Sequence, residues 1–231
     1  MQDKQVLLTG GTGGLGLEVT PALLAKGAKL TVTYIHQEQV KRLQKKLNSQ
    51  EFASIRFVDV NLFEEKAVAQ LINDMERVDV LIHLVGGFAM GKVSEYSYED
   101  WRQDFDLNLN TTFLVCKYSL QKMLEYGYGR IVTVGSRGAV QPGANLAAYS
   151  ASKAGVAALT QAIAAETKGL DITANCVLPS VIDTPANRET MGEEDADKWV
   201  KPESLAEVIC FLASEAARDL RGALVPVYGE A

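Results

Sequence analysis

Two side chains four residues apart, Tyr149 and Lys153, have the clearest capacity for chemistry in this sequence. On a helix this spacing places the phenol and the ammonium on one face, one turn apart. A free tyrosine has a pKa of about 10, too high for proton exchange at neutral pH. A unit charge roughly 4 Å away, at an effective dielectric constant of about 20, supplies the energy, about 4 kcal/mol, that would bring this pKa near neutrality. We therefore expect Lys153 to lower the pKa of Tyr149, although a bare pair of this kind is more often a half-buried tyrosine beside a solvated lysine.

A glycine-rich run stands near the N-terminus, between an apolar run and a helical pattern. Residues 9–16 read TGGTGGLG. Glycines allow a tight turn and a close approach of the backbone to a pyrophosphate, and the helix start offers free amides and a positive dipole end. We interpret the run as a nucleotide-binding loop rather than a simple tight turn. The predicted contacts in it are Gly10, Thr12, Gly13, Gly14, Leu15 and Gly16.

Short aliphatic or β-branched runs alternate with longer helical patterns along the chain. The runs predict strands at 6–9, 29–35, 54–59, 78–85, 130–135, 172–178 and 224–228. The patterns between them predict helices at 15–26, 37–47, 64–76, 98–126, 148–168 and 202–214. Strands that are apolar throughout fit a parallel sheet covered on both faces. The alternation predicts an α/β fold, a doubly wound (Rossmann) parallel seven-stranded sheet with helices on both faces, in a single domain spanning 1–231.

The segment 183–201 fits neither a strand nor a long helix. It follows a predicted strand and contains an acidic run at 193–197. Ligands of such folds bind beyond the carboxyl ends of the strands. We therefore expect this segment to form a substrate lid, with a plain surface loop as the alternative.

The composition limits the classes of protein that fit this chain. Among 231 residues, 23 are Lys or Arg and 29 are Asp or Glu, and the net charge of −6 argues against nucleic acid as a partner. Three widely spaced cysteines among apolar residues, Cys116, Cys176 and Cys210, fit reduced thiols, and with only 2 histidines we expect no metal site. We find no signal peptide and no apolar run of membrane-spanning length. We expect a cytoplasmic protein that does not bind membranes.

The end of the second predicted strand bears on the choice between NAD and NADP. A dinucleotide fold that uses NAD presents an acidic residue to the ribose 2′-hydroxyl about 20 residues beyond the glycines. Tyr34 and His36 occupy this region instead, which leaves room for a 2′-phosphate near His36 or the basic residues that follow it. We favour NADP(H) slightly over NAD(H). After the third strand, Asp59 and Val60 stand where the adenine ring would lie, although an aspartate there is as often a helix cap.

Three motifs together resemble the short-chain dehydrogenase/reductase family over essentially the whole chain. They are the glycine run 9–16, Ser136 thirteen residues before Tyr149, and the pair Tyr149 and Lys153. The resemblance implies an NAD(P)-dependent oxidoreductase that transfers a hydride between the nicotinamide and a small carbonyl or alcohol substrate. It implies that Tyr149 is the general acid/base, that Ser136 polarises the substrate carbonyl, and that Lys153 activates the tyrosine. Tyr149 and Lys153 would also contact the cofactor.

Further roles are implied by the same resemblance. Asn108 is similar to the asparagine that kinks the fourth helix of the family and holds a water of the proton relay; without the resemblance, a helix-interior asparagine that bonds locally would be the better interpretation. The segment 179–184 is similar to the family's Pro-Gly segment, with Ser180 in place of the glycine. The implied cofactor contacts are Pro179, Ile182 and Thr184 in this segment, and Val85, Gly86 and Gly87 after the fourth strand.

One departure from the family concerns the end of the fourth strand. This sequence has His83-Leu84-Val85-Gly86 where the family has Asn-Asn-Ala-Gly. We interpret His83 as a core or sheet-end histidine whose ring bonds to a backbone partner, not as a catalyst.

The motifs leave the substrate open. Four residues are expected to shape an apolar substrate pocket: Phe88, Val140, Met191 and Trp199. The segments 85–91 and 178–188 also resemble the dihydropteridine reductases of the same family, so a dihydropteridine- or quinone-type reductase is an alternative. Ser136, which those enzymes lack, and Tyr34, where they have an aspartate, depart from that subgroup.

The sequence also bears on turnover and on partners. A nucleotide-binding protein that senses the cofactor without turnover is possible, although the intact catalytic residues argue against it. A substrate tethered to acyl carrier protein could dock on Arg130, Arg137 or Arg188, although the acidic run 193–195 would repel that acidic partner.

The alanine-rich helix 147–165 and the family's habit of pairing helices between subunits favour a homodimer or homotetramer.

Overall fold

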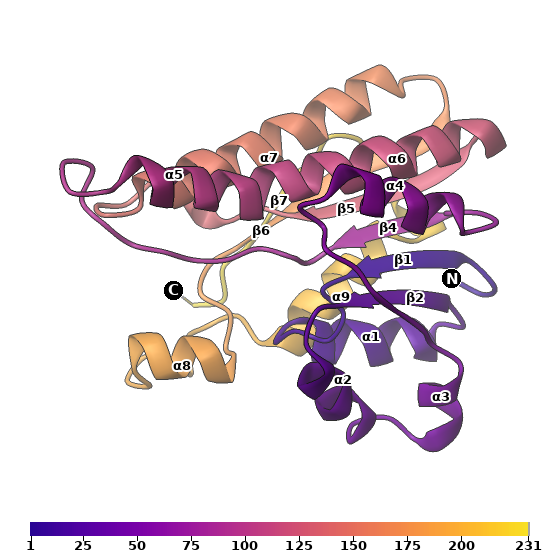
Figure 1. Ribbon diagram of the computed structural model, residues 1–231, viewed down its shortest axis with the longest axis horizontal. Coiled ribbons are helices and arrows are strands. Elements are labelled where there is room, and N and C mark those ends of the chain that lie inside the picture. The colour runs from indigo at the N-terminus through magenta and orange to yellow at the C-terminus, as the bar shows by residue number, and fades with distance from the viewer. Residues whose placement is uncertain (231) are drawn as a thin grey trace.

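A seven-stranded parallel sheet forms the centre of the computed structural model, which describes residues 1–230 (Figure 1). Its strand order is β3-β2-β1-β4-β5-β6-β7. The strands are β1 (Gln5–Thr9), β2 (Lys29–Tyr34), β3 (Arg56–Asp59), β4 (Val80–His83), β5 (Tyr128–Val134), β6 (Asp171–Pro179) and β7 (Leu224–Val227). The direction of winding reverses between β3 and β4, so β1 and β4 lie side by side. This is the switch point at which sheets of this topology bind ligands.

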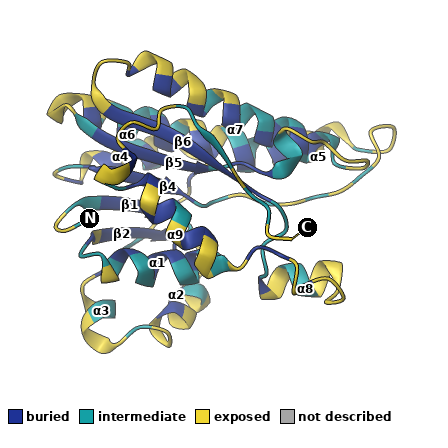
Figure 2. Cartoon of the chain, turned by 180° about the vertical axis from the view of Figure 1, so that it is seen from behind, coloured by how far each residue is buried: buried dark blue, intermediate teal, exposed yellow. Residues whose placement is uncertain are grey.

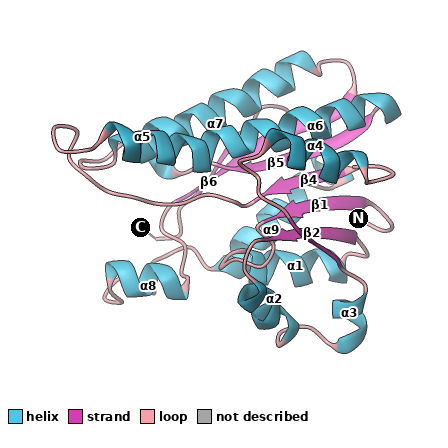
Figure 3. Cartoon of the chain, in the orientation of Figure 1, coloured by secondary structure: helices cyan, strands magenta, loops and turns pink. Residues whose placement is uncertain are grey.

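Helices cover both faces of the sheet (Figure 3). One face carries α4 (Glu65–Asn73), α5 (Tyr98–Phe105), α6 (Thr111–Tyr126) and α7 (Ala147–Glu166). The other carries α1 (Gly16–Ala25), α2 (Gln37–Gln44) and α9 (Pro202–Leu212), with the short α3 (Ser49–Ala53) after α2. The predicted doubly wound fold is confirmed. Within residues 1–230, no helix is both long enough and apolar enough to cross a membrane.

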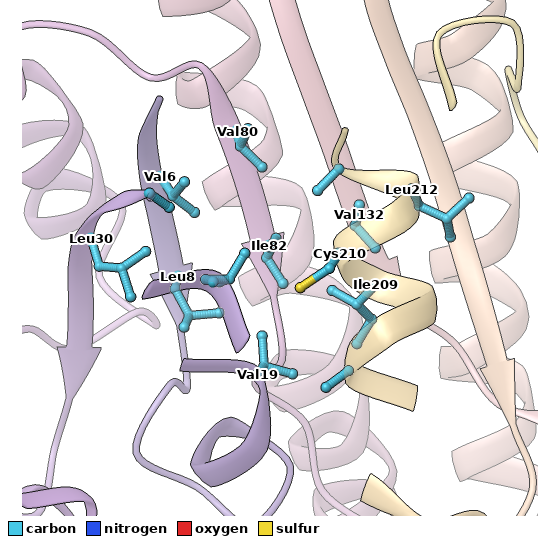
Figure 4. Packing of buried hydrophobic residues seen from close by; sticks show 14 of the residues in the cluster. Val6, Leu8, Val19, Leu30, Val80, Ile82, Val132, Ile209, Cys210 and Leu212 are labelled. Atoms are coloured by element: carbon cyan, nitrogen blue, oxygen red, sulfur yellow. The ribbon is translucent and has the colours of Figure 1, made fainter. Parts of the chain in front are cut away.

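The alternation of side chains along β1 explains why the strands are apolar throughout. Val6 and Leu8 pack with Val19 of α1 and Ile209 of α9 in the core on one face (Figure 4). Leu7 points the other way and joins the core beneath α4 and α6. The inner strands β1, β2, β4, β5 and β6 are therefore largely buried on both faces, whereas the edge strands β3 and β7 are partly exposed (Figure 2). The three cysteines are buried free thiols, as expected.

The structure differs from the prediction in three helical segments. The helix expected at 98–126 is interrupted by a π-helical turn, Asp106–Asn110, between α5 and α6. Helix α3 was not predicted, although the side chains of Asn48 and Glu51 form a capping box at its start. Helix α8 (Pro185–Met191) was not predicted either; it lies in the expected lid, has no buried residue and projects from the body of the fold (Figure 2).

Strand β7 is one edge of the sheet and contains an exposed proline, Pro226. The carbonyl oxygens of Ala223 and Val227 accept hydrogen bonds from the amides of Cys176 and Ser180, at 2.9 and 3.0 Å. Odd-numbered residues of β7 therefore face β6, and Pro226 faces the free edge.

Candidate active site

Three of the predicted catalytic residues meet at the carboxyl end of β5. Ser136 follows this strand, and its Oγ accepts a hydrogen bond from the Gly138 amide at 3.1 Å. Tyr149 and Lys153 lie on successive turns at the start of α7, and the Ser136 side chain is close enough to the Tyr149 phenol to lower its pKa. The ring of Phe88 packs edge-on against the ring of Tyr149, with 5.0 Å between centroids. A proton donor and a second hydroxyl therefore stand side by side next to an apolar ring.

The charges around Tyr149 act differently from the expectation. Lys153 is buried, and its Nζ donates a hydrogen bond to the carbonyl oxygen of Val134 at 2.9 Å. Burial lowers the pKa of Lys153 to about 8. The pKa of Tyr149 is raised, chiefly by burial; the hydrogen bond from Ser136 lowers it, and the negative charge of Asp104 raises it further. Lys153 is not among the groups that shift this pKa, and its ammonium is directed at the backbone of β5, so its effect on Tyr149 stays a prediction.

Asn108 lies within the π-helical turn, where the sequence predicted a kink. Its side chain is completely buried, and its Oδ1 accepts a hydrogen bond from the Gly87 amide at 3.0 Å. Its backbone carbonyl accepts a hydrogen bond from the Thr112 hydroxyl at 2.6 Å. Its Nδ2 is buried and has no hydrogen-bond partner among residues 1–230. The turn thus connects the active-site helices to the loop that leaves β4.

A cleft of about 440 Å³ runs along the carboxyl ends of β1, β2 and β4. Its volume falls within the range of small-molecule and cofactor sites. Predicted cofactor contacts that line it are Gly10, Thr12, Gly13, Gly14, Leu15, Gly16, Tyr34, Val60, Val85, Gly86, Ile182 and Thr184. Lining residues that the sequence did not single out are Thr33, Ile35, Gln39, Asn61, Leu62, Phe63, Leu84, Leu107, Thr111 and Ala186. None of these described lining residues carries a charge.

The glycine run makes a cradle that side chains would fill. A Cβ atom on Gly16 would lie 2.4 Å from the Gly10 carbonyl oxygen, and Gly10 itself has a φ of +73°. A Cβ atom on Gly14 would lie 3.1 Å from Cγ2 of Thr184, at the base of the expected lid. A Cβ atom on Gly86 would lie 2.9 Å from Nζ of Lys153. Glycine is therefore needed for these segments to pack this closely, and all four glycines line the cleft, so the residues present fit a dinucleotide cofactor.

Six predicted cofactor contacts lie outside the cleft lining: His36, Asp59, Gly87, Pro179, Tyr149 and Lys153. His36 and Asp59 are exposed, His36 at the N-cap of α2 and Asp59 at the end of β3. Instead, Gln39 reaches the cleft from α2, and its Oε1 accepts a hydrogen bond from the Thr12 hydroxyl at 3.1 Å. Gln39 lies in the first turn of α2, and no motif in the sequence marked it as a contact.

His83 is buried as predicted, but its partners are not backbone groups. Its Nδ1 lies 2.7 Å from the Thr9 hydroxyl, and its Nε2 lies 3.5 Å from the Thr111 hydroxyl. Sequence periodicity could not have revealed these partners, because they belong to two other elements.

Ion pairs hold the base of the segment 183–201. Asp183 accepts hydrogen bonds from Arg188 Nε at 2.6 Å, from Arg188 Nη2 at 2.9 Å and from Lys201 Nζ at 2.8 Å. These partners, Arg188 first, hold the pKa of Asp183 below its usual range. The Thr184 hydroxyl caps α8 by accepting a hydrogen bond from the Asn187 amide at 3.3 Å. Both ends of the segment are thereby joined next to the cleft.

The residues expected to shape the substrate pocket fall into two groups. Phe88, Val140 and Met191 are 43%, 49% and 48% exposed, whereas Trp199 is 8% exposed and packs inside the fold. Trp199 therefore offers no open surface to a substrate.

Arg130 is fully buried beside Asp171 and Glu215, so the prediction that it could dock a carrier protein is wrong.

Comparison with known proteins places this site in a family. The family model described as short chain dehydrogenase matches residues 4–195. The acetoacetyl-CoA reductase of Acinetobacter sp. (strain RA3849) is 32% identical over 244 residues, covering 99% of this chain and 97% of that protein. The 7alpha-hydroxysteroid dehydrogenase of Bacteroides fragilis is 30% identical over 244 residues, covering 99% and 94%. The solved structure of ElxO with NADP bound has a TM-score of 0.90 at 26% identity, covering 99% and 98%. The chain belongs to the short-chain dehydrogenase/reductase family.

Proposed function

We propose that this NAD(P)-dependent oxidoreductase reduces the carbonyl group of a small molecule, with Tyr149 as the proton donor and NADPH as the preferred cofactor. The observation that carries the proposal is the placement of Ser136 and Tyr149 side by side at the carboxyl end of β5, where a Cβ atom on Gly138 would lie 3.5 Å from Oγ of Ser136 and 3.8 Å from Cε1 of Tyr149. The bound nicotinamide supplies the hydride.

Proton transfer and binding of the substrate oxygen would be carried out by residues of the chain. The Tyr149 hydroxyl would donate its proton to the substrate oxygen, and the Ser136 hydroxyl would hold that oxygen through a hydrogen bond. The pKa of Tyr149 is raised, chiefly by burial, so the phenol carries at neutral pH the proton that a reduction would use. Lys153 would hold the cofactor ribose and Asn108 the proton-relay water, as in the family.

The preference for NADPH is supported by the neutral lining of the cleft. No acidic side chain among residues 1–230 lines it, so nothing there would repel a 2′-phosphate or bind a 2′-hydroxyl as a carboxylate does. Tyr34 and Gln39 line the end of the cleft at β2 and offer neutral hydrogen-bond donors. ElxO, a structural neighbour, was solved with NADP bound.

Two further features belong to this proposal. The segment 183–201 would act as a substrate lid, with Met191 facing the substrate. A homodimer or homotetramer would form through α6 and α7: Ala158, Ala162 and Ala165 are exposed on one face of α7, and Phe113 of α6 is 47% exposed. We place the enzyme in the cytoplasm, where buried free thiols remain reduced.

The experiment that tests the proposed function begins with cofactor binding. NADPH and NADH are titrated by fluorescence, and the preferred one is then oxidised in single turnovers by a panel of ketones, diketones and quinones. We expect tighter binding of NADPH and turnover with at least one carbonyl compound. Binding of neither nucleotide, or binding without oxidation by any carbonyl, would contradict the proposal. Light scattering at several protein concentrations tests the oligomer, and a monomer throughout would overturn it.

A further inference from the structure

His83 forms a bridge among three elements that meet behind the active site. It is the last residue of β4, and its side chain is 2% exposed. Nδ1 faces the hydroxyl of Thr9, the last residue of β1 before the glycine run, at 2.7 Å. Nε2 faces the hydroxyl of Thr111, the first residue of α6 after the π-helical turn, at 3.5 Å. One imidazole thus links the cofactor-binding side of the sheet to the helix pair α5–α6.

The hydrogen atoms of this bridge can be assigned from its contacts. The Thr111 hydroxyl donates its single hydrogen to the carbonyl oxygen of Leu107 at 2.6 Å, so toward His83 it can only accept. A bond between Nε2 and Thr111 therefore needs the imidazole hydrogen on Nε2, and Nδ1 then accepts from the Thr9 hydroxyl. A neutral ring has one hydrogen, which this arrangement places on Nε2. Burial, aided by the positive charge of Lys153, lowers the pKa of His83 to about 3 and keeps the ring neutral.

The bridge ends at the turn that holds Asn108. In a regular α-helix the Leu107 carbonyl would accept from the backbone amide of residue 111; here the hydroxyl of that residue bonds to it. One residue later, the Asn108 side chain accepts from the Gly87 amide at 3.0 Å. His83 and Gly87 are the two ends of one short loop. The π-helical turn is therefore attached to both ends of that loop, once through the imidazole and once through Asn108.

We propose that His83, in its Nε2-protonated tautomer, is a positioning residue that holds the π-helical turn and so sets the place of Asn108 in the active site. The proposal rests on the proposed function, in which Asn108 belongs to the catalytic group. It assigns the neutral imidazole no contact with substrate or cofactor. Loss of the bridge would move the turn, and misplacement of a catalytic group by about 1 Å can cost on the order of 10²-fold in rate.

The first test is spectroscopic and independent of activity. The chain has 2 histidines, so ¹H–¹⁵N correlation of the imidazoles gives two sets of signals, and His36→Gln assigns them. At pH 7 we expect His83 as the Nε2–H tautomer, and Thr111→Val should shift its Nε2 signal. An Nδ1–H tautomer or an imidazolium would overturn the proposal. Because this measurement needs no turnover, it separates failure of the bridge from failure of the proposed function.

The second test is kinetic. We expect His83→Leu to lower kcat roughly tenfold to a hundredfold while changing the NADPH Kd much less, and His83→Gln, which keeps a donor and an acceptor, to recover most of kcat. Thr160→Val is the matched control: it removes another buried threonine hydroxyl, bonded to Thr133 at 2.7 Å, and should lower stability without lowering kcat. If His83→Leu loses as much stability as Thr160→Val but keeps its kcat, the role of His83 is purely structural and the proposal is overturned. If His83→Leu does not fold, Thr111→Val decides: reduced kcat supports the proposal, and unchanged kcat overturns it.

Discussion

Nζ of Lys153 donates a hydrogen bond to the carbonyl oxygen of Val134 at 2.9 Å, so the helix that carries Tyr149 is tied to the end of β5 by a buried ammonium. Lysine prefers water, and burial of this one lowers its pKa. The charge is retained at the site at neutral pH and is lost at mildly alkaline pH.

Cofactor affinity should therefore fall as pH rises through about 8, the pKa of Lys153. Below that pH the ammonium can bind the ribose and attract the pyrophosphate; above it the neutral amine cannot. A charge-assisted hydrogen bond contributes roughly 1.5–3 kcal/mol, so we expect the NADPH Kd to rise about tenfold or more between pH 7 and pH 9.5. Fluorescence titration checks this. In Lys153→Met the Kd should be weak and flat with pH, and a pH dependence that persists in this variant would refute the assignment.

Replacement of Tyr149 by phenylalanine removes the proton donor and little else. We expect kcat to fall by roughly 10²–10⁴-fold, with Tm and the NADPH Kd nearly unchanged. Tyr126→Phe is the control, because that ring is 47% exposed at the end of α6 and its hydroxyl bonds to the Glu76 carbonyl, and it should keep full activity. Near-normal turnover in Tyr149→Phe would remove the tyrosine from the mechanism.

Ser136→Ala tests whether the substrate oxygen is held by a hydroxyl. For a carbonyl substrate, kcat should fall by about 10²–10³-fold, as when a hydrogen-bond donor to a developing oxyanion is removed. A dihydropteridine- or quinone-type reduction should tolerate the change. Steady-state kinetics with each substrate class distinguish the two, with the exposed Ser54→Ala as control.

The glycine run offers a matched pair of substitutions. In Gly16→Ala the new methyl would lie 2.4 Å from the Gly10 carbonyl oxygen, whereas in Gly13→Ala the nearest contact is the same oxygen at 3.4 Å. We expect the first change to cost about 1–3 kcal/mol of stability and the second much less. Thermal unfolding without added nucleotide measures both. Equal Tm values for Gly16→Ala and Gly13→Ala would contradict the prediction, because they would show that the loop backbone can shift to accommodate the methyl group on residue 16.

Asn108→Ala leaves the partly buried Gly87 amide without its acceptor and removes a fully buried side chain. An unsatisfied buried donor costs roughly 1–3 kcal/mol, so for this partly buried amide urea unfolding should show a loss toward the lower end of that range. We also expect kcat to fall, because the water of the proton relay loses its holder. Asn110→Ala, at the exposed end of the same turn, should change stability by less than about 0.5 kcal/mol. The prediction fails if the two variants are equally stable.

The sequence predicted the sheet well because its strands have a strong local signal. Residues buried on both faces must be apolar without interruption, and β1 shows this clearly with Val6, Leu7 and Leu8 all fully buried. The π-helical turn had no such signal, since its wider spacing is maintained by the hydroxyls of Thr111 and Thr112 bonding to the carbonyls of residues 107 and 108. Helix periodicity alone predicts one continuous helix there.

The residues predicted to be catalytic lie together, as their types and spacing suggested, but their electrostatics could not be predicted. The distance from Tyr149 to Lys153 along a helix suggests a lowered pKa, whereas burial of the phenol raises it, and the ammonium of Lys153 bonds to the Val134 carbonyl of another element. The partners of His83 were hidden for the same reason: Thr9 and Thr111 are 74 and 28 residues away. The protonation of these side chains depends on contacts between separate elements, and the pattern of residues along the sequence does not reveal those contacts.

The proline in β7 limits the pairing of another β-strand with this edge of the sheet. A strand that docked on the free edge would need backbone donors along it, and Pro226 has none to offer at the outward-facing position. At this edge of the sheet the proline removes one backbone donor that a pairing strand would use. Pro226→Val would restore that donor and make the β7 edge more open to pairing with another strand.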